Sequence, residues 1–80
     1  MQDWGVRFEQ LRDKYRRDDG SKWSGAAIER ASNGEINGRY VSELRRGKID
    51  DPGVNKLLAI SRAMGFPPWE WFEDLDVEEM

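Results

Sequence analysis

Cysteine and histidine are both missing from the 80 residues. Without cysteine no disulfide can cross-link the chain, and without either residue the usual zinc donor sets are excluded. The lack of histidine also removes the commonest general base and every nucleophile–histidine pair. Carboxylates are present, but no pattern places two of them together in a cleft. We therefore predict no metal site and no cofactor, and we predict that the chain is not an enzyme.

Long apolar runs are missing as well. The longest spans four residues, whereas a membrane helix needs about 20, and the start Met1-Gln2-Asp3-Trp4 lacks the basic and apolar regions of a signal peptide. We expect a cytoplasmic protein without membrane contact. A chain this short supports one core and leaves little room for a pocket of roughly 300 Å³, so no small-molecule ligand is expected.

Charge is abundant but unevenly placed. Charged residues make up 36% of the chain and the net charge is −3. Residues 69–80 hold six acidic and no basic residues, so residues 1–68 hold 13 basic and ten acidic residues, a net charge of +3. We predict one domain over 1–74, of which residues 1–68 are mildly basic, and an acidic tail over 75–80. Such a tail is either a solvated end or the place where a further domain or partner begins.

The apolar pattern predicts an all-α domain with five helices and no strand. The first helix is expected over 3–17, capped by Asp3 and stopped near Gly20, and the fourth over 54–64, ended by Gly65. A short fifth helix is expected over 69–74, after Pro67 and Pro68, with Phe72 turned inward. The apolar stripe of the fourth helix comprises Val54, Leu57, Leu58, Ser61 and Met64.

Two short helices are predicted between these. Ser24 is a plausible cap for the second, whose buried face would be Ala27, Ile28 and Ala31. Asn37 is a plausible cap for the third, expected over 38–46 and ended by Gly47. Residues 32–35 separate the two helices and have the composition of a turn.

The third predicted helix has one apolar side and one polar side. Val41 and Leu44 would face inward. The outer face then carries Arg39, Ser42, Glu43 and Arg46. Arginine can pair bidentately with guanine, and a carboxylate can accept from cytosine or orient a neighbouring arginine. Arg45, Arg46 and Lys48 cluster near the helix end, which suits phosphates, and the Tyr40 hydroxyl is a further phosphate candidate. The alternative is an outer face that is merely solvated.

The segment Tyr40–Lys48, followed by Pro52, Leu57, Ile60, Ala63, Met64 and Gly65, resembles the second half of the Cro/repressor (XRE) helix-turn-helix family. Within that family it is similar to the N-terminal domain of EspR-type actinobacterial regulators, and the likeness extends over 6–72. The resemblance implies a compact five-helix Cro/repressor-like domain. Its expected function is sequence-specific double-stranded DNA binding by a nucleoid-associated prokaryotic or phage transcription regulator that reads the major groove with helix 38–46.

The resemblance also implies individual roles. The positions that match the family's base-reading residues are Gly38, Arg39, Ser42 and Glu43, and those that match its phosphate-binding residues are Ser24, Arg46 and Lys48. The connection between Ala31 and Tyr40 is about three residues longer than the family's usual turn. We therefore expect an altered angle between the two central helices.

Trp69 and Trp71 are two residues apart and cannot share one face of a helix. One of them should therefore be exposed and is a candidate dimer contact. A homodimer is expected because one small domain buries only about 600–1,000 Å² on DNA. The alternative function is a protein-interaction module, antitoxin-like or an adaptor, that keeps the fold without binding DNA.

Overall fold

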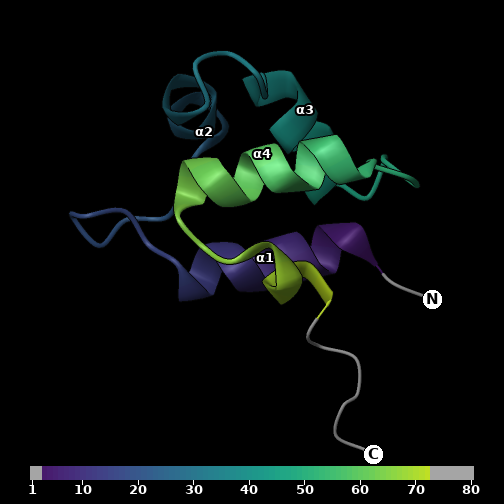
Figure 1. Ribbon diagram of the computed structural model, residues 1–80, viewed down its shortest axis with the longest axis horizontal. Helices are drawn as coiled ribbons and strands as arrows, with labels where there is room; N and C mark the ends of the chain where they lie inside the picture. Colours follow the sequence, from purple (N-terminus) through teal and green to yellow (C-terminus); the bar gives the residue numbers. More distant parts are fainter. Residues whose placement is uncertain (1–2, 73–80) are drawn as a thin grey trace, which may run out of the picture.

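The computed structural model describes residues 3–72, which form four α-helices and one 3-10 helix and contain no strand (Figure 1). The helices are α1 (Trp4–Lys14), α2 (Gly25–Ala31), α3 (Gly38–Arg45), α4 (Val54–Met64) and the 3-10 helix η1 (Pro68–Phe72). The prediction of an all-α domain is confirmed for these residues. The fifth element is not the α-helix expected over 69–74, and residues 73–74 and the predicted acidic tail 75–80 lie outside the described residues.

Capping residues set three of the helix ends as predicted. The Ser24 side chain accepts from the Ala27 amide at 3.1 Å and starts α2. The Asn37 side chain accepts from the Tyr40 amide at 2.8 Å and starts α3. Gly65, with φ of 83°, ends α4 in the left-handed conformation that glycine adopts without a steric penalty. These ends are fixed by local chemistry.

Other expectations about the helices are wrong. α1 ends at Lys14 rather than near residue 17, because Tyr15 is already extended. Val54, expected to face inward, is 66% exposed at the first position of α4, and Ala31 is exposed at the end of α2. Both residues lie at a helix terminus, where the neighbouring turn that would cover them is missing.

The core is built around Trp71, which is fully buried. Its ring stacks on Phe8 at 6.1 Å between centroids, and its indole N–H donates to the Leu57 carbonyl at 2.9 Å. In Figure 1, α4 crosses the middle of the molecule, with α2 and α3 on one side and α1 and η1 on the other. α3 packs against both α2 and α1. The other large side chains that are fully buried are Leu11, Ile28, Ile36, Val41, Leu44 and Ile60.

Candidate nucleic-acid interface

α3 is divided into a buried and an accessible side. Val41 and Leu44 are almost completely buried and belong to the core cluster. The polar residues Arg39, Ser42, Glu43 and Arg46 all retain solvent exposure, either on α3 or at its C-cap. Two side chains therefore anchor this helix, and a polar surface is left on its outer side.

Backbone contacts hold α3 at both ends. A Cβ atom added at Gly25 would lie 3.0 Å from the Gly38 carbonyl oxygen, so α2 and α3 meet without a side chain between their first turns. The Gly38 amide also donates to the Glu29 carboxylate at 2.9 Å. At the other end, a Cβ added at Gly5 would lie 2.7 Å from the Leu44 carbonyl oxygen. The position of α3 is thus defined by glycines on α1 and α2.

The four predicted base-reading residues lie together on the first two turns of α3. The Arg39 side chain is 87% exposed and its Nε lies 3.4 Å from the Glu43 carboxylate. Ser42 and Glu43 are half-buried, and Gly38 lies where α2 and α3 meet. The ion pair orients Arg39 along the helix surface. Because the pair is exposed, separating it costs about 1 kcal/mol or less.

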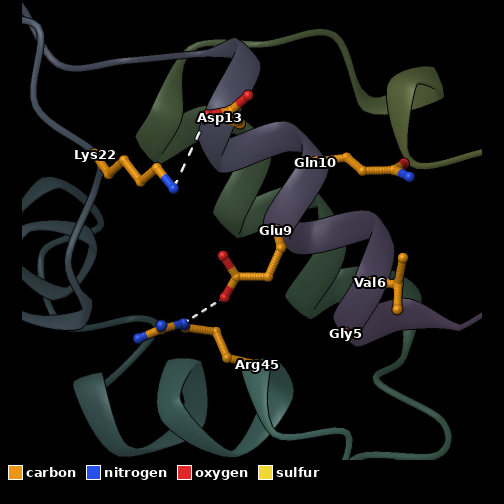
Figure 2. A pocket seen from close by; sticks show the side chains of 7 residues that line it. All are labelled: Gly5, Val6, Glu9, Gln10, Asp13, Lys22 and Arg45. Carbon is orange, nitrogen blue, oxygen red and sulfur yellow. Dashed lines mark hydrogen bonds and ion pairs between the residues drawn. The ribbon is translucent and has the colours of Figure 1, made fainter.

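The basic residues at the C-terminal end of α3 differ in their contacts. Arg45 donates to the Glu9 carboxylate of α1 (Figure 2), and Glu9 also accepts from Arg12 at 2.8 Å. Burial acts to raise the pKa of Glu9, but the bonds and charges of Arg45 and Arg12 outweigh it and lower that pKa. Arg46 and Lys48 are exposed, and within residues 3–72 neither side chain has a hydrogen-bond or ion-pair partner. These two cations are therefore more available to a phosphate than Arg45.

The two remaining phosphate candidates are placed differently. Ser24 is exposed beside Gly25, which brings it close to the start of α3. Its oxygen accepts the capping bond, and its O–H is still able to donate to a phosphate. The Tyr40 hydroxyl donates to the Pro52 carbonyl at 3.2 Å, and burial, with a smaller effect of Asp51, raises the Tyr40 pKa. Donation from Tyr40 to a phosphate therefore requires that this internal bond be broken.

A shallow depression of about 450 Å³ lies beside the Glu9–Arg45 pair (Figure 2). Figure 2 shows Lys22 and Asp13 approaching one another across one end of it, and Val6 at the other end. Its lining mixes carboxylates with cations and holds no enclosed apolar chamber. The residues that line it are Gly5, Val6, Glu9, Gln10, Asp13, Lys22 and Arg45.

A second polar cluster surrounds Glu70, which the sequence analysis grouped with the acidic end of the chain. Glu70 is buried in η1 and accepts from the Tyr15 hydroxyl at 2.6 Å and from Lys14 at 3.0 Å. Arg7 also pairs with this carboxylate at 3.3 Å and donates to the Glu70 carbonyl oxygen. Glu70 therefore attaches η1 to α1 and has no place at the outer face of α3. No local pattern indicates partners 55 to 63 residues away.

The Tyr15 bond has the largest effect on the titration of this cluster. It lowers the pKa of Glu70, against the opposing effect of burial and with further lowering by Lys14 and Arg7. The same bond raises the pKa of Tyr15. The ionised carboxylate and the neutral phenol are therefore the favoured forms in the folded protein.

The aromatic residues of η1 do not all face as expected. Trp69 is 62% exposed, as predicted for one of the two tryptophans, whereas Trp71 is fully buried and is not available as a dimer contact. Phe72, expected to face inward, is 47% exposed and lies edge-on to the Trp4 ring at 5.8 Å. The exposed candidates for a contact are thus Trp69 and Phe72.

Residues 3–72 contain no group of acidic side chains arranged to hold a metal ion. Within the same range, no helix has the length and apolar character required to cross a membrane. Comparison of the chain with family models, with curated proteins and with solved structures finds no match.

Proposed function

We propose that this chain is a sequence-specific double-stranded DNA-binding protein, a prokaryotic or phage transcription regulator of the Cro/repressor type. In this proposal α2 and α3 form the helix-turn-helix and α3 enters the major groove. The observation that carries the proposal is the two-sided character of α3. Val41 and Leu44 hold it in the core, while Arg39, Ser42, Glu43 and Arg46 are accessible.

The proposed contacts follow from the chemistry of these groups. Arg39 pairs with a guanine after leaving Glu43, and Glu43 accepts from a cytosine amino group. Arg46, Lys48 and the Ser24 hydroxyl bind phosphates on either side. Regulation then acts by occupancy of a promoter or operator and needs no chemical step. Two copies on half-sites about 34 Å apart supply the contact area that one domain lacks.

The proposal is tested by selection from a random duplex library at two salt concentrations, followed by binding measurements on the enriched sequence. We expect Arg39→Ala to cost about 1–3 kcal/mol and to relax the preference at one base pair. Arg46→Ala should weaken binding to all sequences alike and reduce the salt slope by about one. Arg30→Ala, which removes an exposed arginine of α2, is the matched control and should change neither property. No enriched motif, or equal losses for all three variants, would contradict the proposal.

The second candidate is a protein-interaction module, antitoxin-like or an adaptor. Trp69 and Phe72 favour it, because two exposed aromatic rings on one short element are typical of a protein contact. In that case selection from random DNA returns no motif, and Trp69→Ser abolishes capture of a partner protein without unfolding the chain.

A further inference from the structure

The C-terminal end of α3 carries three neighbouring cations, which differ in whether an internal acid binds them. Arg46 and Lys48 are exposed, and neither has an ion-pair partner within the described part of the chain. Arg45 instead donates to the Glu9 carboxylate of α1 (Figure 2). Because Arg45 lies one turn after Ser42, it adjoins the polar outer side of α3. One of the three cations beside the proposed interface is therefore already paired inside the protein.

The Glu9 carboxylate is held in place by a second arginine. It accepts from Arg12 of the same helix at 2.8 Å. Arg12 is buried and also donates to the Trp23 carbonyl at 2.8 Å, so the backbone before α2 helps to fix this arginine. Glu9 is thus attached to the body of the domain through α1. A phosphate that binds Arg45 must separate Arg45 from this fixed carboxylate.

A second ion pair of α3 is arranged differently. Arg39 and Glu43 both belong to the outer side of this helix, with 3.4 Å between the guanidinium and the carboxylate. Both side chains therefore enter the groove together in the proposed complex. Arg45 is 48% exposed, which leaves it open to solvent on one side, but its partner lies on another helix. A phosphate can thus approach Arg45 only in competition with Glu9.

We propose that Glu9 is a positioning residue that holds Arg45 away from DNA phosphates, so that Arg46 and Lys48 alone bind the backbone at this end of α3. The proposal rests on the proposed function and adds a control on its affinity. A carboxylate and a phosphate use the same guanidinium donors, so they compete for Arg45. Phosphate contacts carry no sequence information. Withholding one cation therefore lowers the affinity for all sequences and leaves base recognition unchanged.

The first test measures affinity for duplex DNA of random sequence at several salt concentrations. Arg45→Gln should leave the salt slope unchanged, whereas Arg46→Gln should reduce it by about one. Glu9→Gln removes the charge but keeps an oxygen that accepts from Arg12, and it should raise the slope by about one. Its gain in affinity should then shrink roughly threefold to fourfold between about 0.05 M and 0.2 M salt. Thermal melts check that each variant keeps the fold.

A double-mutant cycle separates the release of Arg45 from a general change in charge. The gain from Glu9→Gln should disappear in an Arg45→Gln background. Asp18→Asn is the matched control, because Asp18 is an exposed acid that has no ion-pair partner among the described residues. This control should leave the salt slope unchanged. An equal gain from Glu9→Gln in both backgrounds, or a reduced slope in Arg45→Gln alone, would overturn the proposal.

Retention on immobilised heparin, a sulfated polyanion, tests the same competition without duplex DNA. Glu9→Gln should elute at higher salt than the original protein, and the Glu9→Gln/Arg45→Gln double variant should not. Failure of every variant to bind duplex DNA would refute the proposed function. In that case a later elution of Glu9→Gln would still support the withholding of Arg45 from polyanions, and unchanged elution would refute it.

Discussion

Replacement of Gly5 by alanine should reverse the usual effect of this substitution in a helix. Gly5 is the second residue of α1, where alanine ordinarily stabilises by up to about 1 kcal/mol because glycine loses more backbone entropy on folding. Here the new Cβ would lie 2.7 Å from the Leu44 carbonyl oxygen. That oxygen belongs to the backbone of α3 and has no rotamer by which to move away.

The magnitude follows from these two opposing effects. Overpacking of a close contact costs about 1–3 kcal/mol, and the gain in helix propensity offsets up to about 1 kcal/mol of that. We expect a net loss of about 1–2 kcal/mol in the free energy of unfolding. For a domain of this size each kcal/mol lowers Tm by about 4–8 °C. Because the clash is with α3, the first turn of α1 must shift relative to that helix.

The measurement is urea denaturation together with a thermal melt, followed by circular dichroism. Gly38→Ala is the matched control, because its Cβ would meet nothing closer than 3.4 Å and would make ordinary van der Waals contact. It should leave stability unchanged or raise it slightly. A Gly5→Ala protein as stable as the original would show that α1 and α3 are not in the close contact described above.

The remaining predictions concern η1. Glu70→Gln should cost about 1–3 kcal/mol at neutral pH, because it removes charge from a buried and fully bonded carboxylate. The lowered pKa of Glu70 means that its contribution is complete above the usual carboxyl range and is lost as pH falls through the folded-state value. Denaturation across a pH series should therefore show the two proteins converging in acid, and a constant difference would contradict the assignment. Trp71→Ala should cost about 3–5 kcal/mol, whereas Trp69→Ser should change stability by about 0.5 kcal/mol or less; equal losses in the same melts would argue against the burial described for η1.

The sequence predicts those parts of the fold that depend on neighbouring residues. Ser24, Asn37 and Gly65 define helix ends because each satisfies backbone groups within a few residues of itself. The buried side of α3 can also be predicted from the sequence, because Val41 and Leu44 are apolar residues at helical spacing. The roles assigned to Arg39 and its neighbours remain predictions.

Contacts between segments that are distant in the sequence cannot be predicted from capping residues or from the spacing of apolar residues. α1 was expected to continue to residue 17, but Tyr15 leaves the helix and its hydroxyl bonds to Glu70, 55 residues away. Arg45 likewise donates to the Glu9 carboxylate, although the two residues are 36 positions apart in the sequence. Neither pair has a local signature, because each depends on how two elements are arranged in space.

The inward orientation predicted for Phe72 is wrong, and the type of helix does not account for it. Residues three apart lie on the same side of an α-helix and eclipse one another in a 3-10 helix. Trp69 and Phe72 therefore point outward together, while Trp71 enters the core. The stacking of Trp71 on Phe8 decides which side of η1 is buried, and this contact between distant residues has no local signature in the sequence.

α3 is held in place by close backbone contacts at two glycines and by two buried side chains. This arrangement has a practical consequence for protein engineering. Its outer side chains contribute little to holding the helix, since Gly5, Gly25, Val41 and Leu44 do so. Positions 39, 42, 43 and 46 are therefore open to simultaneous randomisation with small losses of stability. The domain can serve as a compact library scaffold, free of cysteine, in which one helix is rewritten while the rest of the sequence stays constant.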